Sequence, residues 1–133
     1  MPAEPGTYIE TLKVRLLSDE LVQSFDITRE EETPLRAYFR VRCVLTNDDI
    51  LESATYLEIR GEELVLVDYR HQWMTRDHAW RVRWDAIPHY PNLPGAPHHV
   101  HDGSEENVQP GHPMHLADVL DAIAERLAGR GSV

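Results

Sequence analysis

This sequence has a single cysteine and no long apolar run, so it lacks both the cross-links of secreted domains and the segment that would span a membrane. Cys43 is the only cysteine among 133 residues, which excludes an intrachain disulfide. The sequence contains no run of 18 apolar residues, so no transmembrane helix is expected. The start MPAEPGTY lacks the pattern of a signal peptide. We therefore expect a cytoplasmic protein without membrane attachment, folded as one domain over residues 1–133.

Positive charge is also scarce. Thirteen lysines and arginines stand against 23 acidic residues, and the net charge of −10 argues against general, non-specific binding of nucleic acid. Residues 85–133 contain seven acidic and two basic residues, so a basic surface is expected only in the first two thirds of the chain. Twelve of the thirteen basic residues are arginine, which binds phosphate bidentately. A biased base composition of the source genome would explain the same preference.

Hydrophobic periodicity predicts a helix at each end of the chain, over residues 6–23 and 113–128. Pro113 suits the first turn of the second helix, and Gly129 suits its C-terminal stop. The apolar stripes consist of Ile9, Leu12, Leu16, Leu17 and Leu21 in the first helix, and of Leu116, Val119, Leu120, Ile123 and Leu127 in the second.

Between these helices the apolar period changes to two, which predicts strands. Cys43 falls on the apolar side of one such segment, so we expect a buried, unreactive thiol. The connections are too short for parallel crossovers, and residues 24–85 are therefore predicted to form an antiparallel meander. Strands are expected at 35–45, 50–59, 63–73 and 79–85, with a further edge strand at 24–32. The predicted fold is α+β, with four to five strands and an N-terminal and a C-terminal helix.

Arginines alternate with the apolar residues on two of these strands. Arg40, Arg42, Arg81 and Arg83 would share one face of the sheet, extended by Arg36. They either pair with acidic residues of neighbouring strands as an ordinary solvated face, or form a local phosphate-binding surface. Three tyrosines either add stacking surface for unpaired bases or belong to the core: Tyr38, Tyr56 and Tyr69.

Residues 86–112 are predicted to be irregular and include the unusual stretch IPHYPNLPGAPHHVHDG. Six of the eight histidines of the chain lie between His89 and His115. Prolines recur every third residue from Pro88 to Pro97, which is the period of polyproline II. One interpretation is a stiff strap across the molecule whose histidines bind backbone groups. Loops of this length are otherwise mostly functional or disordered.

The histidines of this stretch offer two kinds of chemistry. Three imidazoles and a carboxylate would suit zinc, but their spacing does not match the helical zinc signatures, so we expect no metal and no other cofactor. General acid–base catalysis is the alternative, and beside an arginine-bearing sheet it would suit a metal-independent ribonuclease. The catalytic candidates are His71, Asp85, His89, His98, His99 and His101, and the substrate-binding candidates are Arg40, Arg42, Arg81, Arg83 and Asp102.

Three motifs between Tyr69 and Pro113 read YRHQW, RWDAIPHY and PHHVHDGSEENV. In this order they resemble the pattern Y-x-H-W, R-W-D-N-A-P-H-H and P-H-H-x-H-D-G-x-x-E-N-V of the TumE family of toxins from prokaryotic toxin–antitoxin pairs. The matching residues are Tyr69, His71, Trp73, Arg83, Trp84, Asp85, Pro88, His89, Pro97, His98, His99, His101, Asp102, Gly103, Glu106, Asn107 and Val108. In the first motif Gln72 is inserted between His71 and Trp73. The middle motif departs from the pattern at Ala86, Ile87 and Tyr90, so an asparagine and a second histidine are missing.

The resemblance implies a small toxin that is neutralised by a separately encoded antitoxin, usually one with a helix-turn-helix domain. It does not imply a target; RNA as a substrate follows only from the histidine, arginine and aspartate chemistry. Two further hypotheses remain, a non-enzymatic protein-binding module and a metalloenzyme. An apolar-faced edge strand would also allow a homodimer.

Overall fold

The computed structural model of this chain describes residues 4–129. Two helices and seven strands follow one another in this order: α1 (Pro5–Ser18), β1 (Val22–Thr33), β2 (Arg36–Leu45), β3 (Ile50–Arg60), β4 (Glu63–Met74), β5 (Trp80–Asp85), β6 (His99–Asp102), β7 (Val108–Pro110) and α2 (Leu116–Leu127). The α+β class is therefore confirmed, and so is the additional strand expected at 24–32, which is part of β1.

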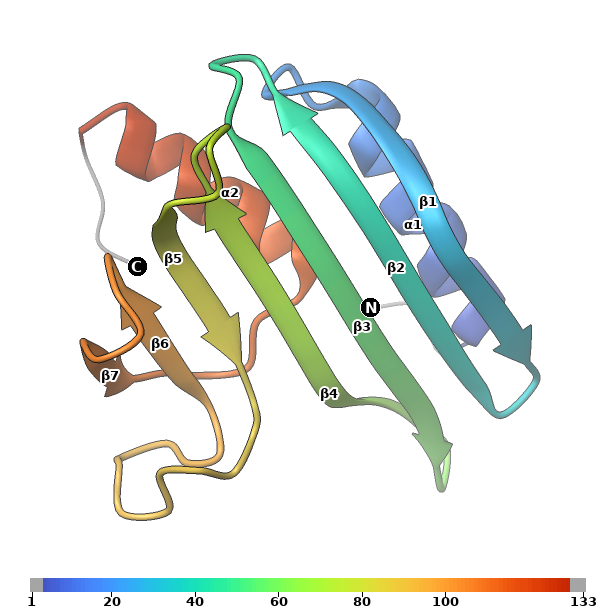
Figure 1. Cartoon of the computed structure of the whole chain (residues 1–133). Helices are drawn as coiled ribbons and strands as arrows, with labels where there is room; N and C mark the ends of the chain where they lie inside the picture. The colour runs from blue at the N-terminus through green and yellow to red at the C-terminus, as the bar shows by residue number, and fades with distance from the viewer. Residues whose placement is uncertain (1–3, 130–133) are drawn as a thin grey trace.

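The seven strands form one antiparallel sheet in chain order, from β1 at one edge to β7 at the other (Figure 1). The prediction of four to five strands was wrong because residues 86–112, expected to be irregular, contain β6 and β7. These strands have only four and three residues, too few for alternation to be recognised. β6 is part of the sheet because it pairs with β5, and β7 because it pairs with β6, rather than through a hydrophobic period.

Both helices lie on the same face of the sheet (Figure 1). The buried residues of their apolar stripes and the inward-facing residues of the strands form one hydrophobic core, to which Phe39 and Cys43 contribute fully buried side chains. Leu17 and Leu127, which were expected in these stripes, are instead 77% and 45% exposed. The helices also contact each other directly, because the hydroxyl of Tyr8 lies 2.5 Å from Nδ1 of His115. Within residues 4–129 no helix has the length and apolar character needed to cross a bilayer.

Both predicted helices were too long. The structure ends α1 at Ser18 and starts β1 at Val22, because Leu21 and Val22 pack against the core from extended chain. Pro113 lies before α2 rather than in its first turn, since His115 occupies the N-cap position. Gly129 does follow the last helical turn, with a positive φ of 73° and its N–H bound to the carbonyl of Arg126.

The face of the sheet opposite the helices, called the open face below, carries the polar residues of the strands. Strand pairing aligns these residues in two neighbouring rows that cross the sheet. One row contains Arg40, Ala54, Arg70, Asp85 and His99; the other contains Arg42, Glu52, Gln72, Arg83 and His101. Both rows end in histidines of β6, so the arginines of the early strands and the histidines of the late segment share one surface.

Candidate active site

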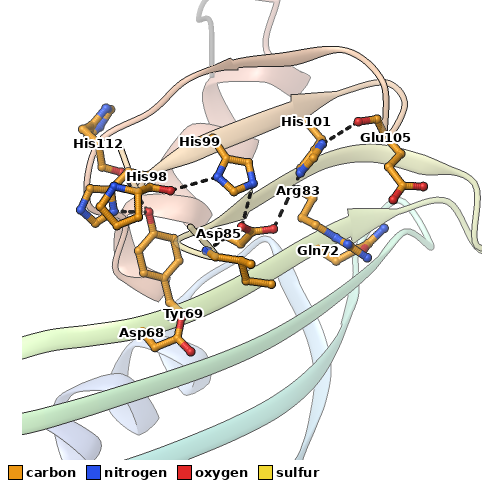
Figure 2. A network of polar contacts seen from close by, with 12 residues as sticks. Asp68, Tyr69, Gln72, Arg83, Asp85, His98, His99, His101, Glu105 and His112 are labelled. Atoms are coloured by element: carbon orange, nitrogen blue, oxygen red, sulfur yellow. Dashed lines mark hydrogen bonds and ion pairs between the residues drawn. The ribbon is translucent and has the colours of Figure 1, made fainter. Parts of the chain in front are cut away.

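Three polar side chains meet on the open face where β5 pairs with β6. Asp85 lies directly opposite His99, and His101 follows two residues later on the same side of β6. Nε2 of His99 is 2.8 Å from Oδ1 of Asp85, and Nε2 of His101 is 3.8 Å from Oδ2 (Figure 2). These side chains are only 2% to 6% exposed. We call Asp85, His99 and His101 the histidine–aspartate cluster.

The second ring nitrogen of each cluster histidine is held by the backbone. Nδ1 of His99 lies 3.0 Å from the carbonyl oxygen of Pro97, and Nδ1 of His101 lies 2.8 Å from that of Glu105. A carbonyl oxygen only accepts hydrogen bonds, so each Nδ1 carries the proton. Each Nε2 is thereby directed toward Asp85 with its ring orientation fixed.

Aromatic rings and a backbone amide complete the surroundings of the cluster. The ring of Tyr90 packs edge-on, with its centroid 5.0 Å from that of His99 and 6.1 Å from that of His101. Trp80 contacts the ring of His101 at 5.8 Å. The backbone N–H of Ile87 donates to Oδ1 of Asp85 over 3.1 Å. Segment 86–98, which connects β5 to β6, thus covers the cluster rather than leaving it open to solvent.

Arg83 is the cation nearest to the cluster along β5. It lies opposite His101, donates from Nε to Gln72 over 2.6 Å, and stacks on Trp80 with its guanidinium carbon 4.0 Å from the ring centroid. Burial, and to a lesser degree the charge of Arg70, lowers the pKa of Arg83. The hydrogen bond to Gln72 and the stacking on Trp80 together fix the guanidinium in place.

A depression lies next to the cluster on the open face. It has a volume of about 230 Å³ and is lined by Tyr38, Arg40, Ala54, Thr55, Tyr56, Asp68, Tyr69, Arg70 and Ile87. Ala54 pairs with Arg40 on one side and with Arg70 on the other, and its small side chain leaves the space between them. Within the described residues, neither arginine side chain forms a hydrogen bond or an ion pair. We call this depression the arginine groove.

Two of the three tyrosines that line the arginine groove, Tyr38 and Tyr56, are half-buried on the open face. Tyr38 and Tyr56 pair across β2 and β3, and both also line a second depression of about 640 Å³ toward β1. Tyr69 instead belongs to the core, where its hydroxyl lies 2.9 Å from Nδ1 of His98 and 3.2 Å from the carbonyl oxygen of His112. Two of the three tyrosines considered for base stacking are therefore on the surface that would need them.

His71 does not border the cluster, contrary to the sequence-based expectation. It alternates with Gln72 on β4 and is completely buried on the helix-covered face. Its Nδ1 lies 2.8 Å from the hydroxyl of Ser53, and its Nε2 lies 2.8 Å from the carbonyl oxygen of Met114. Burial lowers its pKa to about 4. His71 thus connects the sheet to the segment that leads into α2.

His98 and His89 also lie outside the cluster. His98 stacks on Tyr69 with 5.7 Å between ring centroids, because its side chain and that of His99 leave the chain on opposite sides. Its pKa is lowered by partial burial. His89 is exposed on segment 86–98, and its ring contacts Tyr90 rather than Asp85. Of the six catalytic candidates, the structure brings together Asp85, His99 and His101.

Three of the residues proposed for substrate binding are engaged in ion pairs. Arg81 is an unpaired residue of a bulge and contacts Asp49 at 2.6 Å, so it does not join Arg83 on the open face. Arg42 pairs with Glu52 across β2 and β3 at 2.6 Å. Asp102 pairs with Arg126 of α2 at 2.9 Å. Arg40 and Arg83 remain available on the open face.

Arg70, Gln72 and Tyr90 were missed by the sequence-based reasoning. Arg70 and Gln72 alternate with Tyr69, His71 and Trp73, so period two already placed them on the polar side of β4. The register that aligns them with Asp85 and Arg83 is a property of the folded sheet. Tyr90 stands at one of the positions where the sequence departs from the family pattern, and its contacts with the cluster required the path of segment 86–98.

The fold and the site together define a small α+β protein with both helices on one face of an antiparallel sheet and a histidine–carboxylate site on the other. The family model described as Toxin TumE matches residues 12–127, and the chain therefore belongs to this toxin family. Neither the curated proteins nor the solved structures contain a match to this chain. The resemblance seen in the three sequence motifs is confirmed by the family match.

Proposed function

We propose that this chain is the toxin of a toxin–antitoxin pair and that it acts by cleaving RNA at the histidine–aspartate cluster. The observation that carries the proposal is the convergence of Asp85, His99 and His101 at one end of an arginine-bearing sheet face. Membership of a toxin family supports the toxic role. The cleavage reaction and the antitoxin partner are the parts proposed here.

The arginine groove supports RNA as the substrate. Arg40 and Arg70 lie on the open face without an acidic partner and can each contact a backbone phosphate. Tyr38 and Tyr56 offer rings for stacking of unpaired bases, a mode of binding that requires no particular sequence. A local site of this kind is compatible with the net charge of −10, because the rest of the surface repels nucleic acid.

RNA cleavage requires two things that this surface offers. An oxygen nucleophile has to lose its proton while the phosphorus–oxygen bond to the leaving group breaks and that oxygen gains a proton. The negative charge that builds up on the phosphate has to be stabilised. The cluster would activate the nucleophile, while Arg70, the register neighbour of Asp85, and Arg83, the neighbour of His101, would stabilise the phosphate.

The proposed partner is a protein antitoxin, of the helix-turn-helix type that the family resemblance implies. An acidic toxin is suited to a partner with a basic surface. Cytoplasmic location follows from this role, since both RNA and antitoxin would be met there. A homodimer remains a prediction that the solution mass of the purified chain would test.

The test is controlled expression of the chain with and without the neighbouring reading frame, followed by measurement of growth and RNA integrity. Wild-type protein should arrest growth and cleave RNA, and His99→Ala and His101→Ala should lose both activities by at least about 100-fold, the contribution of one acid–base group. His112→Ala, an exposed histidine, serves as the matched control. Unchanged toxicity of both cluster variants would contradict the proposal and favour a non-enzymatic binding module.

A further inference from the structure

We propose that Asp85, His99 and His101 form a binding site for one divalent metal ion of the zinc class. These are the same residues to which the proposed function assigns RNA cleavage. Binding of the ion does not depend on that function, and only its use in cleavage rests on it. It differs from the expectation drawn from the sequence, where the spacing of the histidines argued against a metal and favoured metal-independent chemistry.

The geometry brings three potential ligand atoms to one point. One oxygen of Asp85 and one nitrogen each of His99 and His101 all lie within 4.8 Å of one another. The site is formed on two paired strands, and each histidine ring is fixed by its own backbone hydrogen bond. Little rearrangement is therefore needed to bring the three atoms to the distances of about 2.0–2.2 Å from zinc that such ligands adopt.

The hydrogen-bonding roles of the three groups leave a cation as the missing component. Because each Nδ1 donates its proton to a carbonyl, the Nε2 of a neutral ring has only a lone pair to offer. The carboxylate of Asp85 also only accepts. When both rings are neutral, three acceptors therefore face one another and need a cation between them. An Nδ1–H bound to a backbone carbonyl is also the usual second-shell arrangement of a metal-bound histidine.

Burial strengthens this argument. A buried carboxylate has to be paired or has to bind a metal, because its transfer from water is otherwise costly. Within residues 4–129, the only ion-pair partners of Asp85 are His99 and His101, which are charged only when protonated, and the closest arginine along β5, Arg83, is bound to Gln72. A divalent ion would supply the missing positive charge among the three side chains.

The ligand types select the class of ion. Two imidazoles and one carboxylate suit zinc and related transition-metal ions, whereas magnesium and calcium prefer oxygen ligands alone. Three protein ligands leave a position for water or a substrate oxygen, as in catalytic zinc sites. A metal-bound water loses its proton near neutral pH, which would provide the nucleophile for RNA cleavage without a free imidazole as base.

The experiment measures metal binding on the purified full chain, without RNA. After removal of metals with a chelator, the protein is titrated with Zn²⁺ by calorimetry, and the bound ion is quantified by elemental analysis. One ion per chain is expected, with affinity lowered at least about 100-fold in His99→Ala and in Asp85→Ala, since even second-shell changes cost 10- to 100-fold. His89→Ala and His112→Ala, both exposed histidines, are matched controls that should bind as the wild type does.

A second measurement does not depend on the folding of buried-site variants. In wild-type protein, ¹⁵N spectra of the histidine rings should show Zn²⁺ shifting Nε2 of two histidines while their Nδ1 stays protonated. Absence of saturable binding, or binding that persists in both cluster variants, would overturn the metal site. Stoichiometric binding without any RNA cleavage would support the metal site and overturn the proposed function. Cleavage by the chelator-treated, metal-free chain would support that function and overturn the catalytic use of the ion.

Discussion

Asp85 and His99 are direct cross-strand partners on β5 and β6, and 2.8 Å separates the carboxylate oxygen of one from Nε2 of the other. This pairing explains how residues 14 positions apart in the chain form one site. Cross-strand partners have Cβ atoms only about 5 Å apart, so the pairing alone brings the two side chains within contact distance. On the other side of Asp85, the same row continues to Arg70 and ends at Arg40.

Loss of one groove arginine should weaken RNA binding in a salt-dependent manner. We expect Arg40→Ala and Arg70→Ala each to reduce the slope of log affinity against log salt by about 0.7, the value for one phosphate contact on single-stranded nucleic acid. Fluorescence titration of a short RNA at several salt concentrations would measure this slope. Arg60→Ala is the control, since this exposed arginine pairs with Glu58 at the β3–β4 turn. Equal slopes for all three variants would contradict the groove as the RNA site.

His71 should make the stability of the fold depend on pH in the acidic range. Its pKa is about 4 in the folded protein against 6.5 ordinarily, so the unfolded chain binds the proton more readily. Neutral His71 contributes about 3 kcal/mol to the unfolding free energy. This contribution is complete above pH 6.5 and is lost as the pH falls toward 4. Urea unfolding between pH 7 and pH 4 would measure it.

The matched variants for this measurement are His71→Gln and His112→Ala. We expect His71→Gln to be less stable at pH 7, because the bonds to Ser53 and Met114 are disturbed, but to lose less stability on acidification than the wild type. His112 is exposed, and its replacement should leave the pH dependence unchanged. A wild-type pH dependence that His71→Gln retains in full would show that other groups cause it.

Gly95 should be required for the path of segment 86–98. Its φ of +80° is unfavourable for other residues, and a Cβ atom at this position would lie 2.3 Å from the carbonyl oxygen of Gly111. We expect Gly95→Ala to lower the unfolding free energy by about 1–3 kcal/mol and to shift the NMR signals of His98 and His99. Gly61 has a similar φ of +66° but no atom within 4 Å of such a Cβ, so Gly61→Ala controls for backbone strain alone. Equal effects of the two variants would exclude the contact with Gly111 as the cause.

Periodicity predicted the elements that have their own apolar pattern. The helices around residues 6–23 and 113–128 and the strands from β2 to β5 were found in approximately the expected places, because each buries one apolar face. The edge strand β1 was also expected, although none of its residues is fully buried. Cys43 lies in the core with its pKa raised to about 12 by burial, as the alternation around it indicated. Strands β6 and β7 were not found, since three or four residues are too few to show a period.

The candidate site was predicted only in part, for a related reason. The sequence singled out His99 and His101 in a segment predicted to be irregular and Asp85 at the end of a predicted strand, but it grouped His71, His89 and His98 with them. Neighbouring residues in a strand face opposite sides of the sheet. Along β4 and along residues 98–101, this alternation separates His71 and His98 from the cluster. His71 and His98 therefore lie away from Asp85, and His71 is buried toward the helices.

The sequence by itself determined that the chain is α+β and acidic, which motifs it shares with a toxin family, and which residue types are available for chemistry. Only the tertiary structure decided which of them meet, because the register of β5 against β6 and the path of segment 86–98 depend on contacts between distant residues. It also decided the orientation of the cluster histidines, since each Nδ1 faces a backbone carbonyl. Those contacts turn a histidine-rich segment that argued against a metal into a site with three converging acceptors.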